Sequence, residues 1–412
     1  MTNSETKNFS QNVSSSYHLE DRCKCNKNTC ANTCNVPKLR FKGYNDEWVE
    51  KRIEKVLKIK HGKDQKAIEN NDGIYPILAT SGEIGRSNTF LWDKPCVLIG
   101  RKGTINKPQY MDTPFWTVDT LFYSDVFQNN NAKYLYYLFN TINWKKYDES
   151  TGVPSLSAKT IERIKIKISN NLREQEKIAS FLTLIDKKIE KQKELVELLK
   201  KYKRGLFSAI FSQKLKFKDD NGNDYPAWEE KRLGDICKIV GGGTPDTNNV
   251  KYWGDDINWF TPTEIIKKYA DSSNRKISRL GLLKSSAKIL PIGTVLLTTR
   301  ATLGEMSILS IEATTNQGFQ SLIPVKDEAS SEFIYYCQPI IKHFCYKYAN
   351  GSTFLEISKQ TLAKLKLMIP NKDEQNKISD FLSKFDNKIQ QEECILSNLK
   401  TYKKGLLQQM FI

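Results

Sequence analysis

The sequence contains an internal duplication, with the two copies 200 residues apart in a chain of 412 residues. Residues 173–211 align without a gap on residues 373–411, and 16 of the 39 aligned positions are identical. The copies end in similar basic stretches, YKRGLFSAIF from Tyr202 and YKKGLLQQMF from Tyr402. Repetition of one structural unit predicts a chain made of two similar halves, and any proposed fold has to satisfy this constraint.

Both copies have the apolar spacing of a long helix that packs along one seam. Their apolar residues recur four and three positions apart, which is the period of a coiled coil. One polar residue interrupts each seam, Gln192 or Glu392, and such a residue typically sets the register. We therefore predict two long antiparallel helices that form a coiled coil, over residues 172–213 and 372–412. The seam residues are Ile178, Leu182, Ile185 and Ile189 in the first copy, and Ile378, Leu382, Phe385 and Ile389 in the second.

The two predicted helices share start and stop signals. Each begins with an asparagine three residues before a glutamate, a pattern that satisfies free amide groups at a helix N-terminus. The pairs are Asn171 with Glu174 and Asn371 with Glu374. Toward the other end, basic residues precede Gly205 and Gly405. Because cations suit a helix C-terminus and glycine permits a left-handed turn, we expect each helix to end near its glycine.

The segments that precede the helices, residues 37–171 and 214–371, also resemble each other. Near its start each carries a tryptophan, Trp48 or Trp228, followed by similar residues, and each contains an apolar strand followed by a basic turn. Both close on a short helix followed by a strand. The sequence thus predicts an α+β fold with two similar globular domains, separated by the two helices and related by a pseudo-two-fold axis.

The net charge of the chain points to a polyanionic partner. Lys and Arg outnumber Asp and Glu by 64 to 47, which gives +17 at pH 7. The excess is spread over both predicted domains and the first helix, which favours a shaped nucleic-acid surface over a basic tail. Symmetric DNA readers place their half-sites about 34 Å apart, and a helix of about 40 residues is long enough to separate them. No apolar stretch is long enough to span a membrane and no signal core is visible, so we expect a cytoplasmic protein.

The first 36 residues form a Ser/Asn-rich leader that contains a cluster of cysteines. Its members are Cys23, Cys25, Cys30 and Cys34. Four thiolates could complete a tetrahedral zinc site, but the spacing C-x-C-x4-C-x3-C lacks paired C-x2-C knuckles. We interpret the leader as a flexible, reduced segment and keep a zinc site as the weaker alternative.

No motif in the chain predicts catalysis. An amino-methyltransferase would need an Asn/Asp-Pro-Pro-aromatic loop, and FTPTE (260–264) lacks the amide–proline pair. GGGTP (241–245) is not followed by the Gly-Lys-Ser/Thr of a phosphate-binding loop. The three histidines have no metal spacing, and no metal-nuclease cluster is visible. We therefore expect the chain by itself not to be an enzyme.

Candidate DNA-binding residues lie in and near the basic turns of the two domains. Arg and Lys can read guanine, Asn and Gln can read adenine, and hydroxyl groups can hold phosphates. Arg101 and Arg300 are expected to recur at matching places. The candidates are Lys63, Arg86, Arg101, Lys102 and Thr104 in the first domain, and Thr244, Thr263, Arg300, Thr302, Asn316 and Gln317 in the second.

Several longer stretches resemble the specificity (S) subunit of type I restriction–modification systems. They are GGGTPDTNNVKYWGDDINWFTPTEI, LLTTRATLGEMSI, TTNQGFQSLIP and PNKDEQNKISDFL, together with the terminal YKKGLLQQMF. The resemblance covers about residues 37–412. It departs from the family pattern in the Cys-rich leader and at Ser169, which stands where the second copy has Pro370; this change could loosen the entry to the first helix.

The resemblance implies a division of labour between this chain and its partners. Each domain would be a target recognition domain for one half of a bipartite, asymmetric DNA site. The helices would act as a ruler and dock two methyltransferase (M) subunits, to which two motor–nuclease restriction (R) subunits attach. S-adenosylmethionine, ATP and Mg²⁺ would belong to those partners, and this chain would bind no cofactor.

Three other interpretations remain open from the sequence. A coiled-coil scaffold that never reads DNA fits the duplicated seam but not the charge. A self-contained methyltransferase would bind S-adenosylmethionine without a partner. A stand-alone DNA-binding protein would bind tightly and specifically with no methyltransferase present.

Overall fold

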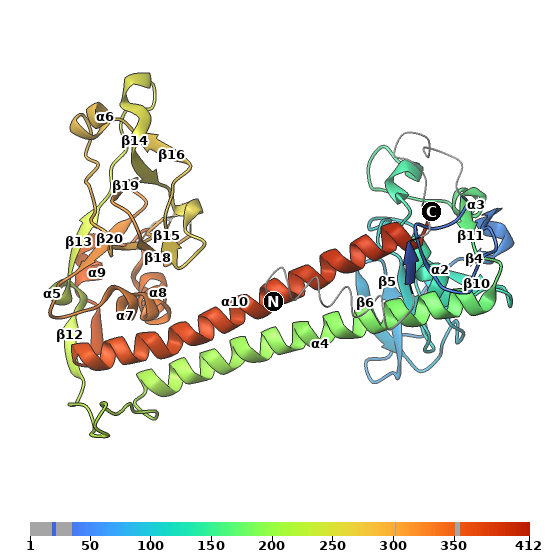
Figure 1. Ribbon diagram of the computed structural model, residues 1–412, viewed down its shortest axis with the longest axis horizontal. Helices are drawn as coiled ribbons and strands as arrows, with labels where there is room; N and C mark the ends of the chain where they lie inside the picture. The colour runs from blue at the N-terminus through green and yellow to red at the C-terminus, as the bar shows by residue number, and fades with distance from the viewer. Residues whose placement is uncertain (1–18, 22–34, 301, 351–354) are drawn as a thin grey trace. The chain divides into compact units, whose positions relative to one another are not determined.

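The computed structural model describes residues 19–21, 35–300, 302–350 and 355–412 (Figure 1). By its internal contacts the chain divides into two units, Met1–Val196 with Gln391–Ile412, and Glu197–Gln390. Each unit contains one predicted domain, the start of one long helix and the end of the other. The four clustered cysteines of the leader lie outside the described residues. Within the leader, β1 (Leu19–Asp21) pairs antiparallel with β2 (Leu39–Phe41).

The domain of the first unit is built around two small sheets and a helix. A four-stranded sheet has the order β4-β10-β7-β8, a three-stranded sheet has the order β6-β5-β9, and β3 pairs with β11. Their bounds are β3 Val49–Arg52, β4 Leu57–Lys60, β5 Tyr75–Ala79, β6 Gly82–Ser87, β7 Cys96–Gly100, β8 Gln109–Met111, β9 Trp116–Thr117, β10 Leu121–Val126 and β11 Lys165–Ile168. The helical segments are η1 Ile53–Lys55, α2 Ala132–Phe139, η2 Trp144–Tyr147, α3 Ala158–Arg163 and the start of α4 Leu172–Phe211.

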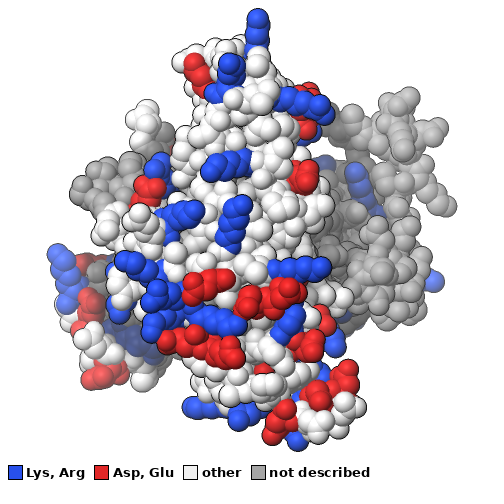
Figure 2. All heavy atoms as spheres, turned by 90° about the vertical axis from the view of Figure 1, so that its left-hand side faces the viewer, with Lys and Arg blue, Asp and Glu red and all other residues white. Residues whose placement is uncertain are grey.

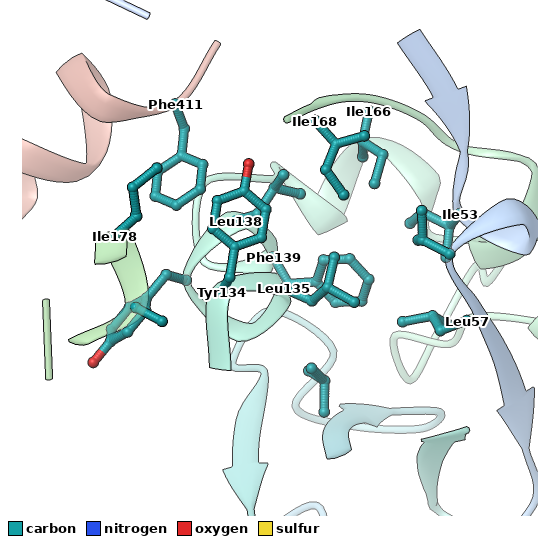
Figure 3. Close-up of a cluster of buried hydrophobic side chains, with 14 of the residues drawn as sticks. Ile53, Leu57, Tyr134, Leu135, Leu138, Phe139, Ile166, Ile168, Ile178 and Phe411 are labelled. Carbon is teal, nitrogen blue, oxygen red and sulfur yellow. The ribbon is translucent and has the colours of Figure 1, made fainter. Parts of the chain in front are cut away.

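Helix α2 carries the core of the first unit because two of its faces are apolar. Figure 3 shows Tyr134 beside Phe411, which follows α10, with Ile178 of α4 on the same side of the cluster. Other side chains of α2 lie on the side of the strands, near Leu57. The domain and the ends of both long helices therefore share one hydrophobic core in this unit.

The second unit repeats this topology with additions. Its sheets have the orders β13-β20-β17-β18-β15 and β16-β14-β19, and β12 pairs with β21. The strand bounds are β12 Glu229–Arg232, β13 Cys237–Gly241, β14 Trp253–Phe260, β15 Tyr269–Ala270, β16 Arg275–Ile277, β17 Val295–Leu297, β18 Met306–Leu309, β19 Ala313–Thr315, β20 Gln320–Pro324 and β21 Lys366–Ile369. The helical segments are α5 Leu233–Ile236, η3 Val250–Tyr252, η4 Pro262–Glu264, α6 Arg279–Leu283, α7 Ser331–Tyr336, α8 Gln338–Tyr348, α9 Lys359–Ala363 and the start of α10 Lys372–Met410. The prediction of two similar α+β domains is confirmed.

Both long helices start as predicted but continue past their glycines. Asn171 Oδ1 accepts a hydrogen bond from the amide of Glu174, and Asn371 Oδ1 accepts one from the amide of Glu374. The expectation of a stop at Gly205 and Gly405 is wrong, because both residues are helical and neither has a positive φ. Apolar residues on the far side of each glycine pack into a core, and this burial carries the helix onward.

The predicted seam is largely buried, but it packs against the domains as well as against the other helix. Ile178 and Leu182 belong to a core shared with the first domain and with Met410. Ile378 and Leu382 belong to the corresponding core of the second unit. Seven of the eight predicted seam residues are buried or pack against a core, and Phe385 is half-buried. The seven are Ile178, Leu182, Ile185, Ile189, Ile378, Leu382 and Ile389.

Polar contacts within each unit orient the two helices antiparallel. In the first unit, Gln192 Nε2 donates to Glu392 Oε2 at 2.6 Å, so the two interruptions of the seam meet each other. Each unit also contains a cluster of one aspartate, one lysine and one tyrosine. The clusters are Asp186 with Lys403 and Tyr137 in the first unit, and Asp386 with Lys203 and Tyr336 in the second. None of the helices in the described ranges is long and apolar enough to cross a membrane.

Candidate nucleic-acid interface

Two hydrogen-bonded loops of the second domain bring several predicted DNA-binding residues together. The glycine-rich loop after β13 carries Thr244, whose hydroxyl donates to Gln317 Oε1 at 2.5 Å. Gln317 and Asn316 lie in the turn between β19 and β20. The amide of Gly243 donates to Thr315 O at 2.8 Å, which fixes the two loops to each other. Thr244, Asn316 and Gln317 therefore share one surface.

The loop after β17 and the turn η4 join the same surface. Thr302 Oγ1 donates to Pro262 O at 3.3 Å, and the exposed Thr263 follows that proline. The amide of Thr299 donates to a carbonyl of the β19–β20 turn at 2.7 Å, which places Arg300 beside that turn. All the predicted residues of the second domain thus lie in four loops that contact one another.

The first domain builds an equivalent loop cluster. The exposed Lys63 follows β4, and its amide donates to Thr117 O at 2.8 Å. The turn after β7 holds residues 101–104, and the amide of Arg101 donates to Thr120 O at 2.8 Å. Two segments therefore meet around the β9–β10 turn. One carries Lys63, and the other is the turn after β7 with Arg101, Lys102 and Thr104.

A close backbone approach shows that the two loop clusters are matched. A Cβ added to Gly62 would lie 2.1 Å from Val118 O, and one added to Gly242 would lie 2.0 Å from Asn316 O. No side chain fits at either distance, so both sites require glycine for the same geometric reason. The β9–β10 turn of the first domain thus corresponds to the β19–β20 turn of the second.

The matched hydrogen bonds shift the expected pairing of the arginines by one residue. Arg101 occupies the place of Thr299, since the amide of each donates to the corresponding turn. Lys102 then corresponds to Arg300. The turns are equivalent, but Arg101 and Arg300 do not stand at the same position within them.

Carboxylates hold all three predicted arginines. The pairs are Arg101 with Asp119, Arg300 Nη2 with Glu356 Oε1 at 2.9 Å, and Arg86 Nε with Glu83 Oε1 at 3.0 Å. Arg86 stands apart from the loop cluster, because it lies in β6 opposite Pro76 and its partner belongs to the same strand. The sequence analysis did not predict Asp119 and Glu356 as partners of these arginines. For Asp119 a signal existed, because TVDT (117–120) aligns with TNQG (315–318) and sets Asp119 opposite Gln317.

The charges on the second domain do not form one continuous basic patch on the face drawn in Figure 2. Basic side chains are scattered over this face, and acidic side chains are mixed with them in its lower half. Ion pairs also connect β12 to neighbouring segments. Lys231 Nζ of β12 lies 2.5 Å from Glu328 Oε2, and Glu230 Oε1 of β12 lies 2.7 Å from Lys366 Nζ. On this face, charge alone therefore does not mark a binding surface.

The described residues of the loop clusters offer binding groups and no candidate metal centre. They contain no group of three or more His, Cys, Asp and Glu that could hold a metal ion. Burial raises the pKa of the Cys96 and Cys237 thiols to about 12 in each case, so both remain protonated near neutral pH. What the loops do present is hydroxyl, amide and cationic groups, the types that contact phosphates and base edges.

Comparison with known proteins gives both domains the same assignment. The family model described as the type I restriction modification DNA specificity domain matches residues 45–200 and again residues 226–401. The type I restriction enzyme MjaIX specificity subunit of Methanocaldococcus jannaschii is 36% identical over 194 residues, 46% of this chain and 45% of that protein. The EcoR124I/EcoR124II specificity subunit of Escherichia coli is 27% identical over 262 residues, 62% of this chain and 63% of that protein. The aligned regions thus span less than two thirds of either relative.

The fold has a counterpart among solved structures. The S subunit of a type I restriction–modification system from M. genitalium superposes with a TM-score of 0.60 at 17% identity, over 92% of this chain and 99% of that one. This likeness concerns the fold, including its two domains. Because the family model matches twice and covers most of the sequence, the chain belongs to the family of type I restriction–modification DNA specificity proteins.

Proposed function

We propose that the chain is the sequence-specific DNA-recognition subunit of a type I restriction–modification complex. The observation that carries the proposal is the pair of matched loop clusters, one in each family-matched domain, at the same place in the topology. Two similar but non-identical clusters suit the two halves of an asymmetric, bipartite site. Lys102 in one cluster and Arg300 in the other give the halves different reading groups.

The long helices supply the spacer between the half-sites. In this proposal they form an antiparallel coiled coil, relate the two domains by a pseudo-two-fold axis and set the number of unspecified base pairs. The antiparallel contacts within each unit support this arrangement, above all the hydrogen bond of Gln192 with Glu392. The helices also dock two M subunits, to which two R subunits attach.

The chemistry of the complex belongs to its partners. The chain itself is non-catalytic and binds no cofactor, while the M subunits bring S-adenosylmethionine and the R subunits bring ATP and Mg²⁺. The complex works in the cytoplasm, where it methylates or cleaves DNA according to what the two loop clusters recognise.

The arginine–carboxylate pairs suggest how the loops change on binding. Arg101 and Arg300 each leave a partly exposed carboxylate pair to contact DNA, and each exposed pair contributes little stability, of the order of 0–1 kcal/mol. The carboxylates hold the guanidinium groups in place before binding and oppose binding to phosphate at random positions. Specific contacts to guanine then replace the lost ion pairs.

The experiment that tests the proposal is single-molecule methylome sequencing of cells that carry this chain and its M subunit. The wild type should methylate a split motif with a fixed spacer. Arg101→Ala should relax or abolish recognition of one half only, and Arg300→Ala should affect the other half only. Arg52→Ala is the matched control, because Arg52 is exposed on β3 and lies outside both loop clusters.

Different outcomes separate the competing functions. Equal loss at both halves from one substitution would contradict the modular reading. An unchanged methylome, with the M subunit shown to be present, would favour the scaffold or a stand-alone DNA-binding protein. Direct binding of the purified chain to DNA then distinguishes these two.

A further inference from the structure

The start of α4 shows how the first unit satisfies a buried carboxylate. Glu174 is fully buried, and Arg40 pairs with it in a bidentate manner, at 2.6 Å from Nε to Oε1 and 2.9 Å from Nη2 to Oε2. Ser169 also donates its hydroxyl to Oε2. The serine therefore tightens this helix start, against the expectation of a looser entry at this position.

The second unit keeps the carboxylate but lacks these donors. Glu374 is 4% exposed, and the indole N–H of Trp228 donates to its Oε2 at 3.0 Å. The residue in the place of Ser169 is Pro370, which has no hydroxyl. The residue in the place of Arg40 is Lys216, and its side chain is exposed.

Ring contacts show that the two helix starts correspond in the residues beside this difference. Phe41 and Phe181 make an edge-on contact at 5.7 Å, and Phe217 and Phe381 make the same contact at 5.5 Å. Lys216 precedes Phe217 as Arg40 precedes Phe41. In the first unit the guanidinium of Arg40 fills the space beside the glutamate. In the second unit the exposed Lys216 does not fill the corresponding space.

A cavity of about 100 Å³ lies at this place in the second unit. Glu374 lines it from within, and the exposed Asp224 lines it near the surface. Three aromatic side chains, Phe217, Tyr225 and Trp228, form part of the wall, as does Ala227. The lining itself carries two carboxylates and one cation, Lys216, and outside it Lys218 Nζ lies 3.9 Å from Asp224 Oδ1, so Glu374 is the carboxylate left for an incoming cation. Carboxylates beside aromatic rings are the setting in which a guanidinium binds through ion pairing and stacking.

We propose that this cavity, lined by Glu374, Asp224, Trp228 and Tyr225, is a binding site for the guanidinium of an arginine presented by a partner protein. The first unit holds the same group internally as Arg40, which supplies the geometric precedent. The proposal goes beyond the DNA-recognition role, and it does not depend on it. Burial raises the pKa of Glu374, an effect that an incoming cation would reverse.

Arginine fits this site better than lysine does. The planar guanidinium can donate two parallel hydrogen bonds to the free side of the carboxylate while its face lies against an aromatic ring. An ammonium is more strongly hydrated and offers a point charge, so it loses more on entering an enclosed site. The exposed position of Lys216 agrees with that difference.

The test uses the full chain labelled with 5-fluorotryptophan, whose seven tryptophans give separate fluorine NMR signals. N-acetyl-argininamide is the probe, and Trp228→Phe assigns the signal of Trp228. We expect a saturable shift of this signal and no shift of Trp48, because Glu174, the counterpart of Glu374 in the first unit, is already paired with Arg40. N-acetyl-lysinamide should bind at least about tenfold more weakly.

Variants decide whether the site is the one proposed. Glu374→Gln should abolish the saturable shift, and Ala227→Leu, which fills the cavity wall but keeps the carboxylate, should do the same. Lys216→Arg should block the probe and raise the melting temperature, because it supplies the guanidinium internally. Equal binding of the probe to the wild type and Glu374→Gln would overturn the proposal. So would a Lys216→Arg chain that still binds the probe as the wild type does. Neither readout involves DNA, so failure here leaves the DNA-recognition proposal standing.

Discussion

Glu174 in the first unit and Glu374 in the second occupy the same position of the repeated helix, yet their surroundings differ. A guanidinium and a hydroxyl hold Glu174, whereas an indole N–H holds Glu374 beside a cavity. The next residue behaves identically in both copies. Gln175 Oε1 accepts from the amide of Asn131 at 2.8 Å, and Gln375 Oε1 accepts from the amide of Ser330 at 2.9 Å.

The comparison teaches which parts of a duplicated junction are fixed by the backbone. Gln175 and Gln375 tie the helix start to the domain through main-chain groups, which are the same for any side chain. The glutamates depend on side-chain donors, and these have changed between the two copies. The two helix starts therefore share their main-chain contacts. They differ in their side-chain contacts, because the first supplies its own guanidinium to Glu174 and the second leaves a cavity beside Glu374.

The largest expected effect comes from removing the internal guanidinium. Arg40→Met should destabilise the first unit by about 3–5 kcal/mol, because it leaves Glu174 buried without its ion-pair partner. Lys216→Met at the corresponding exposed position should change stability by less than about 0.5 kcal/mol. Hydrogen exchange read by mass spectrometry can follow the starts of α4 and α10 separately. Similar losses at the two sites would mean that Lys216, and not a ligand, completes the second junction.

A smaller and equal effect is expected at the two aspartate clusters, where the units agree. Tyr137 donates to Asp186 Oδ2 at 2.8 Å, and Tyr336 donates to Asp386 Oδ2 at 2.7 Å. Each aspartate also pairs with a lysine of the other long helix. Asp186→Asn and Asp386→Asn should each cost about 1–2 kcal/mol of unfolding free energy, since a partly buried charge-assisted contact is lost. The free energies of unfolding of the two variants are measured with urea. A large difference between their losses would show that the two aspartate clusters are not equivalent.

A pH-dependent difference is expected between Glu374 and its glutamine variant. Burial, opposed by the Trp228 N–H, raises the folded-state pKa of Glu374 above its ordinary value of 4.5. The native state therefore binds this proton more tightly than the unfolded state does. As pH rises from below 4.5 through the raised pKa, this residue lowers the free energy of unfolding, and the loss is complete above that pKa.

Glu374→Gln removes this pH dependence and keeps an oxygen that can accept from Trp228. The variant should gain stability relative to the wild type as the pH is raised from 4 to 7, by a small amount. Thermal unfolding at several pH values measures the difference. A wild type that instead gains on the variant over this range would show that Glu374 is stabilised as a carboxylate, as it would be with a cation already beside it.

The parts of the fold that were predictable from sequence are those with local or repeated causes. The period of the seam and the asparagine caps act within a few residues, and the repeat at 200 residues reveals the two-domain plan without any knowledge of contacts. The stop at each glycine failed for the opposite reason. Burial of residues beyond the glycine, such as Met410, outweighs the weak helix propensity of one residue.

The candidate interface was predictable as a set of loops but not in its pairings. Aligned turns place Thr244, Asn316 and Gln317 in the right loops, because a turn is a local feature. The pair of Arg40 with Glu174 joins residues 134 apart in sequence, and no spacing rule connects them. The cavity beside Glu374 is still less visible, since it arises from what Lys216 does not fill.

The smallest expected effect concerns the glycines, where the two copies should again behave alike. Gly205 and Gly405 are helical, and a Cβ added at either one meets nothing within 4 Å. Because glycine in a helix interior costs about 0.5–1 kcal/mol relative to alanine, Gly205→Ala and Gly405→Ala should each stabilise the chain by about that amount. Urea unfolding of each variant gives the sign, and Ala209→Gly in the same helix is the reverse control.

If alanine stabilises the chain at both positions, the fold does not require glycine at 205 and 405. Their role would then lie in the assembled complex. Alanine variants that gain stability but lose assembly with the M subunit would assign the bare backbone at 205 and 405 to close contact with a partner. Variants that gain stability and assemble normally would leave both glycines without a role in assembly. Loss of stability at either site would mean that the helix does not run straight through that glycine, and the structural correspondence of the two copies would fail there.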